Sequence, residues 1–288
     1  MNRRDRIKLS LTRNWKFPGR ERLAHFLKSS DNLRKDLQNG LTWLNDEPIA
    51  IYTTADNYIE CCILETGTYE AEIEKLISIS LREGDTALDI GANIGLQSLR
   101  MARYTGKTGQ VLCFEPLPHL QKKLLNNVAL NRAVNIKLFP YALSDNSAIL
   151  QLSVNEQAWN QGTFNIGGNE NGYPKQKIIV MVADDLPELL HLTELHMIKI
   201  DVEGFELNVL NGLKKTIVKF KPRIIFEYDE NYWTRNTTSV IECYELLKEF
   251  HYSLFQIYPA GCELICSAAE FKSGNIFCIQ QNPDDDKA

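Results

Sequence analysis

The chain has 288 residues, of which 44% are hydrophobic and 24% charged, and its formal net charge is −5. This composition is that of a globular protein with room for one α/β domain, and the negative charge argues against nucleic acid or an anionic membrane as partner. The longest apolar runs are strand-sized and fall short of the roughly 20 residues of a transmembrane helix, so no membrane span is expected.

The N-terminal region, residues 1–64, is predicted to be an extension that packs on the main domain. Leu23, Phe26 and Leu27 have helical spacing, although a solvated basic terminus is the alternative. No apolar stretch typical of a secretion signal follows the first arginines, which favours a cytoplasmic location. Short strand-like pieces surround Pro48.

A helix is predicted from residue 69, and a regular alternation of strands and helices begins at residue 86. The hydrophobic pattern predicts helices over 69–81, 96–105 and 117–131, and strands over 86–90, 109–116 and 135–139. Alternating strands and helices are typical of a parallel sheet covered on both faces. The first part of the chain therefore predicts an α/β fold.

Residues 144–183 interrupt this rhythm. Residues 148–155 alternate apolar and polar side chains, a Gly/Asn-rich loop follows, and 177–182 resemble a further strand. We expect a β-hairpin-like insertion over the edge or mouth of the sheet. It either carries substrate contacts or is a plain solvent loop.

The alternation then resumes. Strands are predicted over 197–201 and 223–228, helices over 204–220 and 239–250, and two final strands over 252–258 and 275–281. The final two have no helix between them, so they must be antiparallel if they pair.

The stretch "LDIGANIG" places glycines directly after a strand, where the backbone can approach a ligand. A dinucleotide site would read G-x-G-x-x-G, whereas here Asp89 precedes Gly91, Asn93 and Gly95. An acid at this point favours a ligand with a positive amine or sulfonium over a pyrophosphate. Glu115 ends the next strand, where a carboxylate can accept ribose hydroxyls. The pattern indicates S-adenosylmethionine, the alternative being glycines that only serve helix packing.

The ordered motifs "GDTALDIGANIG", "VLCFEPLP", "MIKIDVEGFELNVLNG" and "PRIIFEY" resemble the FkbM family of S-adenosylmethionine-dependent methyltransferases over about 65–230. The resemblance implies a Rossmann-like class I methyltransferase fold with a seven-stranded, mostly parallel sheet whose last strand is antiparallel. The methyltransferase domain would span 65–282, with a disordered tail at 283–288. The reaction would be methyl transfer to a hydroxyl of a sugar, glycan or secondary metabolite.

The same resemblance implies which residues hold the cofactor. Its methionine side would be lined by Asp89, Gly91, Asn93 and Gly95, and its ribose would be bound by Glu115. Adenine would be flanked by Pro116, Ala142 and Leu143, and the amino-acid end would lie at Tyr69 and Glu70.

The candidates for catalysis follow the strand predicted over 197–201, in "KIDVEGFE". Asp201 is the expected base or acceptor-positioning group, because a hydroxyl acceptor must lose its proton. Glu203 and Glu227 are its expected partners or metal ligands, and Lys199 shares its strand face. Alternatively, Lys199 and Asp201 form a structural ion pair and Glu203 caps a helix. Glu206 is expected to be structural.

No histidine has a convincing position for a base, and no required metal is expected. The seven cysteines suit reduced thiols better than a disulfide framework or a zinc site. Three other functions stay open: N-methyltransferase, metal-dependent catechol-type O-methyltransferase, and non-catalytic binding module. The expected partner is a small-molecule, sugar or glycan acceptor. The oligomeric state is open, with a homodimer among the options.

Overall fold

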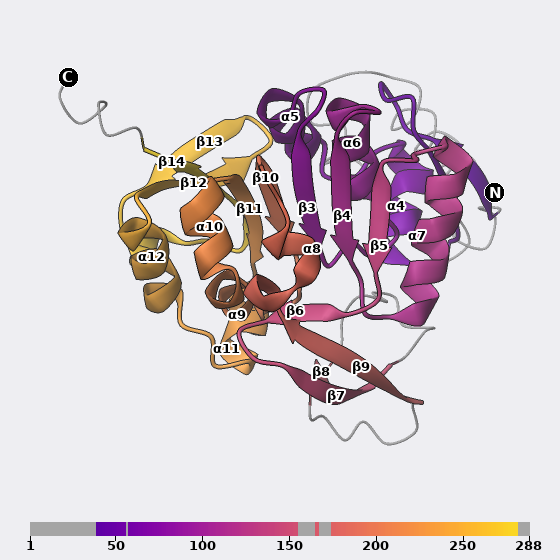
Figure 1. The fold of residues 1–288 in the computed structure, drawn as a ribbon. Helices are drawn as coiled ribbons and strands as arrows, with labels where there is room; N and C mark the ends of the chain where they lie inside the picture. The colour runs from indigo at the N-terminus through magenta and orange to yellow at the C-terminus, as the bar shows by residue number, and fades with distance from the viewer. Residues whose placement is uncertain (1–38, 56, 155–164, 167–173, 282–288) are drawn as a thin grey trace.

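The computed structural model describes residues 39–55, 57–154, 165–166 and 174–281. The predicted N-terminal helical stripe and the tail at 283–288 lie outside these residues. The described residues form three sheets, of eight, four and two strands, and the carboxyl ends of the central strands of the eight-stranded sheet face the four-stranded sheet (Figure 1). No helix of the described part of the chain is long and apolar enough to span a membrane.

The larger sheet has eight strands in the order β13-β12-β14-β11-β10-β3-β4-β5. In that order they are Gly261–Ile265, Tyr252–Tyr258, Gly274–Gln280, Arg223–Tyr228, Met197–Ile200, Thr86–Ile90, Gln110–Phe114 and Ile136–Phe139. The five strands from β11 to β5 are parallel, and β14 is antiparallel to both β11 and β12. The predicted antiparallel last strand is therefore confirmed.

The predicted number of strands, seven, is one too few. The additional strand, β13, forms a hairpin with β12 at the edge of the sheet. Its first four residues are exposed and Ile265 alone is buried, so it has almost no buried face. Without such a face it has no apolar period that would mark it in the sequence.

Helices cover both faces of the larger sheet, so its central strands are buried on both sides. Ala87 of β3 packs in one core cluster with α5 (Ala71–Ser80), α6 (Leu96–Thr105) and α7 (Pro118–Asn131). Leu88 and Ile90 of the same strand pack in another cluster with α9 (Glu206–Gly212), α10 (Lys214–Phe220) and α12 (Val240–Glu249). Successive strand residues point to opposite faces, so a doubly covered strand reads as one apolar run.

Several helices differ from the prediction. The single helix expected over 204–220 is divided into α9 and α10 at Leu213. Three short helices were not predicted: α4 (Tyr58–Thr66), α8 (Pro187–Leu190) and α11 (Glu230–Arg235). Six of the nine residues of α4 are buried, so its apolar side chains do not form one stripe.

A two-stranded hairpin, β1 (Gly40–Trp43) and β2 (Ala50–Thr53), precedes α4. The side-chain oxygens of Asn127 and Asn131 on α7 accept hydrogen bonds from the β2 backbone at Tyr52 and Ala50, each at 2.9 Å. The hairpin is thereby attached to the main domain.

The insertion forms a sheet of its own, in the order β6-β9-β7-β8. Its strands are Ala142–Ser144 (β6), Ala148–Ser153 (β7), Asn165–Ile166 (β8) and Lys175–Val182 (β9). The expected antiparallel pairing of the two long strands is observed between β7 and β9, but β6 adds a parallel partner to β9. A four-stranded sheet thus replaces the expected hairpin.

Candidate active site

A cavity of about 290 Å³ lies between the carboxyl ends of the main sheet and the insertion sheet, both of which contribute to its lining. Eight of the fourteen predicted site residues line it: Gly91, Asn93, Glu115, Pro116, Ala142, Leu143, Asp201 and Glu203. The other six are outside its lining: Tyr69, Glu70, Asp89, Gly95, Lys199 and Glu227. The predicted site residues therefore fall into two groups, those that line the cavity and those outside it, which include a charged cluster of Glu70, Asp89, Lys199 and Glu227.

The turn after β3 is left-handed at three alternate positions, with φ of 81° at Gly91, 51° at Asn93 and 84° at Gly95. Asparagine tolerates this conformation better than most residues, which explains why it stands where a dinucleotide motif has glycine. The backbone N–H groups of Gly91 and Ala92 both donate to the carbonyl oxygen of Phe114 on β4. The turn is thereby held against the adjacent strand.

Gly91 also allows two strands to approach closely, since a Cβ there would lie 1.9 Å from the carbonyl oxygen of Asp201. We expect Gly91→Ala to lower the free energy of unfolding by roughly 3 kcal/mol through this clash and the left-handed φ. Urea denaturation measures the loss. Gly40→Ala is the control, because no atom of the described residues lies within 4 Å of its added Cβ, and an equal effect of the two substitutions would contradict this argument.

Asp89, at the end of β3, is 1% exposed. Its Oδ2 accepts a hydrogen bond from Ser98 Oγ at 2.5 Å, while Oδ1 has no hydrogen-bond partner among the described residues. Burial raises the pKa of Asp89, and the charge of Lys199 opposes that rise. A buried acceptor without a partner is costly and is consistent with a functional role.

Glu115 connects the turn to the end of β4. Its Oε2 accepts from the backbone N–H of Asn93 and its Oε1 from that of Leu117, both at 2.9 Å. Burial raises its pKa to about 7. Each oxygen retains a second lone pair, so Glu115 can still accept hydroxyl groups of a ligand in the cavity.

Lys199 and Asp201 form an ion pair, with 2.9 Å between Nζ and Oδ2. β10 ends at Ile200, so Asp201 is the first residue after the strand and not its last. Desolvation by itself would lower the pKa of Lys199, but the charges of Asp201, Asp89 and Glu70 outweigh it and raise the pKa. The ion pair that was considered as an alternative is present, and Asp201 still lines the cavity with 31% of its side chain exposed.

Glu203 has a left-handed φ of 55°, and its buried Oε2 has no hydrogen-bond partner within the described ranges. Burial, followed by the charge of Asp201, raises its pKa to about 8, although Tyr232 donates a hydrogen bond to it. Glu227, on β11, has a pKa well above its usual value because of Asp201 and then burial. These carboxyl groups repel one another and favour shared protons at neutral pH.

Glu206, expected to be structural, directs both carboxylate oxygens at the protein itself. Its Oε1 accepts from the backbone N–H groups of Val202 and Gly204, and its Oε2 accepts from the indole of Trp233 at 2.7 Å. These hydrogen bonds fix the loop between β10 and α9 and attach it to α11 through Trp233.

Tyr69 and Glu70 lie at the start of α5, where Glu70 is left-handed with φ 48° and ψ 58°. Gln97 donates to Glu70 Oε2 at 2.8 Å, and Asn275 of β14 donates to Oε1 at 3.2 Å. Burial raises the pKa of both Tyr69 and Glu70. The charges of Lys199 and Asp201 also act on Glu70, so this turn belongs to the charged cluster beside the cavity.

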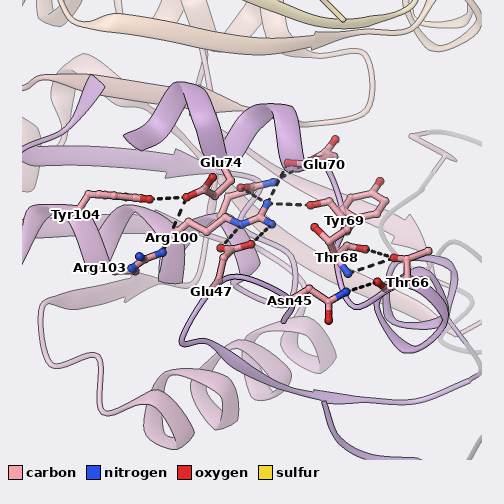
Figure 2. Close-up of polar contacts among 11 residues, drawn as sticks. Asn45, Glu47, Thr66, Thr68, Tyr69, Glu70, Glu74, Arg100, Arg103 and Tyr104 are labelled. Atoms are coloured by element: carbon pink, nitrogen blue, oxygen red, sulfur yellow. Dashed lines mark hydrogen bonds and ion pairs between the residues drawn. The ribbon is translucent and has the colours of Figure 1, made fainter. Parts of the chain in front are cut away.

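Two groups of contacts had no signal in the sequence, whereas the insertion was expected over the edge or mouth of the sheet. Gln97 and Asn275 reach Glu70 from other elements. The ion pair of Arg100 with Glu47 lies beside the same turn, since Arg100 also donates to the carbonyl oxygens of Tyr69 and Glu70 (Figure 2). The insertion supplies an apolar wall of the cavity through Ala148, Leu150, Ile178 and Val180. Such contacts depend on how elements pack, which no local period records.

The described residues contain no group of three or more His, Cys, Asp or Glu side chains arranged to hold a metal ion. No histidine lines the cavity. His196 instead accepts from the backbone N–H of Thr86 and pairs with Asp85 at the amino end of β3. The polar side chains that line the cavity are carboxylates, amides and the hydroxyl of Ser144.

Comparison with known proteins agrees with this geometry. Residues 89–254, more than half of the chain, match the family described as "Methyltransferase FkbM domain". "Methyltransferase 1" of Beauveria bassiana is 27% identical over 163 residues, which cover 50% of this chain and 65% of that protein. The hexuronic acid methyltransferase AglP of Haloferax volcanii is 28% identical over 148 residues, 51% of this chain and 58% of that protein.

Among solved structures, the methyltransferase FkbM from Methylobacillus flagellatus KT is similar at 16% identity and a TM-score of 0.44, over 77% of this chain and 52% of that one. The chain spans less than two thirds of the length of the two curated relatives. The matched segment begins at Asp89 and includes the glycine turn, Glu115 and the acidic segment after β10. The chain belongs to the methyltransferase FkbM domain family.

Proposed function

We propose that the protein transfers a methyl group from S-adenosylmethionine to a hydroxyl group of an uncharged sugar, glycan or secondary metabolite. The observation that carries this proposal is that Glu115 and Asp201 line one cavity. Such a reaction needs a carboxylate that binds the ribose of the cofactor and a proton acceptor beside the hydroxyl group of the substrate.

The cofactor would lie across the carboxyl ends of β4, β3 and β10. Ribose hydroxyls would donate to Glu115, adenine would lie between Pro116 and Leu143, and the methionine part would extend over Gly91 toward Glu70. The unpartnered oxygen of Asp89 and the acidic cluster beyond it suit a ligand with a positive sulfonium and ammonium group. Methyltransferase relatives support this assignment.

Asp201 is the proposed base. The sulfonium already activates the methyl group, so the protein has to align the acceptor and remove its proton. Lys199 holds the Asp201 carboxylate from behind at 2.9 Å. Glu203, with a pKa of about 8, is mostly protonated near neutral pH and is the partner that can share its proton with Asp201.

The charge of the cavity restricts the acceptor. Among the described residues, its lining contains three carboxyl residues, Glu115, Asp201 and Glu203, and no lysine or arginine. Lys175 and Lys177 of the insertion are exposed, whereas Ile178 and Val180 of the same strand line the cavity. One relative is named a hexuronic acid methyltransferase, which favours a sugar, but the carboxylates of this cavity would repel a uronate.

A panel of matched acceptors tests the proposal. We expect transfer of labelled methyl from S-adenosylmethionine to methyl glucoside to exceed transfer to methyl glucuronide at least about tenfold, because of like-charge repulsion. Preference for the glucuronide would contradict the uncharged acceptor, and transfer to none of the panel would contradict the sugar assignment. Methylation at the nitrogen of methyl glucosaminide instead would favour the N-methyltransferase alternative, which the acidic cluster also suits.

A further inference from the structure

We propose that Arg100, held by Glu47, is a positioning residue that fixes the Tyr69–Glu70 turn at the cofactor's amino-acid end. This role rests on the proposed function. It makes the β1–β2 hairpin, which carries Glu47 in its turn, a necessary support of the cofactor site, although the hairpin lies outside the segment matched by the family.

Arg100 connects three segments of the chain. It is 0% exposed, and its Nε and Nη2 donate to Glu47 at 2.9 and 2.6 Å in a two-pronged ion pair. Its Nη1 donates to the carbonyl oxygens of Tyr69 at 2.9 Å and Glu70 at 3.1 Å, as Figure 2 shows. Planar, forked donors suit such simultaneous contacts, which a lysine would not reproduce.

The turn that Arg100 holds is an unfavourable one. Glu70 is left-handed, and its side chain does not cap the helix that it begins. A non-glycine residue keeps this conformation only where surrounding contacts determine it. The hydrogen bonds from Arg100 to the carbonyl oxygens of Tyr69 and Glu70 hold the backbone of the turn in this conformation. Gln97 and Asn275 orient the Glu70 carboxylate.

Because Arg100 is on α6, its contact with the Tyr69–Glu70 turn connects that turn to the glycine turn. α6 begins directly after Gly95, so the helix that ends the glycine turn also carries Gln97 and Arg100. The two side chains therefore set the distance between the glycine turn and Glu70. Glu47 supplies the charge that a buried guanidinium needs when its remaining donors are directed to neutral carbonyl groups.

Calorimetry with two ligands separates positioning from general stability. S-adenosylhomocysteine carries the amino-acid part, and 5′-methylthioadenosine lacks it. For Glu47→Gln and Arg100→Met we expect the affinity for S-adenosylhomocysteine to fall about tenfold, equivalent to roughly 1.4 kcal/mol, with the affinity for 5′-methylthioadenosine unchanged. Arg103→Met is the matched control, because Arg103 lies on the same helix but is partly exposed and contacts Glu74 at 4.0 Å.

The possible results distinguish the positioning role of Arg100 from a general effect on stability and from failure of the proposed function. An equal loss for both ligands, or no loss in a variant that still melts cooperatively, overturns the positioning role. If Arg100→Met fails to fold, Glu47→Gln decides, because it removes one charge and retains an acceptor oxygen. Failure of the unaltered protein to bind S-adenosylhomocysteine would overturn the proposed function itself, and the positioning role with it. A control variant with the same selective loss would also overturn it.

Discussion

Replacement of Asp201 by asparagine is expected to lower kcat about 10²–10⁴-fold, the usual contribution of a positioned general base. The asparagine keeps the shape and one acceptor oxygen but cannot take the proton of the acceptor hydroxyl. The affinity for S-adenosylhomocysteine should change little, because the cofactor contacts proposed above are made by other residues. The measurement is release of S-adenosylhomocysteine on an acceptor found in the panel, beside calorimetric binding.

The control for this substitution is Glu230→Gln. Glu230 is an exposed acid at the start of α11, outside the cavity lining, so its loss should leave kcat unchanged. Full turnover by Asp201→Asn would exclude Asp201 as base and leave the ion pair with Lys199 as its role. A fall in turnover with a matching fall in cofactor affinity would indicate damage to the site and not loss of a base.

Glu115→Gln is expected to weaken binding of S-adenosylhomocysteine about 100-fold, since two hydrogen bonds from ribose to a charged acceptor contribute roughly 1.5–3 kcal/mol each. Glutamine retains one acceptor oxygen, so one of the N–H groups of Asn93 and Leu117 keeps a partner and the turn is less disturbed than by alanine. Calorimetry on the folded variant measures the change. Glu83→Gln, at an exposed position before β3, is the control.

The pH dependence of binding gives the same prediction an independent check. The ribose hydroxyls require ionised Glu115, whose pKa is about 7 in the free protein. Affinity should therefore fall as the pH decreases below about 7, by up to tenfold per pH unit. For folding the sign is opposite, because ionisation of a group with a raised pKa costs stability as the pH rises from 4.5 through 7. A Gln variant with the same pH dependence as the unaltered protein would contradict the assignment.

The fold was predictable where burial leaves a period in the sequence. The strand at 86–90 has every residue buried, and its apolar run marked it correctly. β13 and α4 were missed for opposite reasons, since the first has almost no buried face and the second is buried on most sides. The break at Leu213 was missed because the apolar positions of α9 and α10 continue in phase across it.

The candidate site was predictable only in part. The motif placed Asp89, Gly91, Asn93 and Glu115 correctly around one turn, because these residues are close in sequence or lie at adjacent strand ends. The resemblance predicted that Tyr69 and Glu70 lie at the cofactor's amino-acid end, which stays a prediction, and it did not indicate which contacts hold their turn.

The sequence by itself determined the alternating strands and long helices of the main sheet, the glycine turn and the acidic segment after β10. Each follows from a local period or a short motif. The tertiary structure decided which distant groups meet there: Asn275 reaches Glu70 across 205 positions, Glu47 reaches Arg100 across 53, and the insertion places its apolar strands over the cavity. These contacts depend on strand order and loop path, and side chains that meet only through packing leave no pattern along the chain.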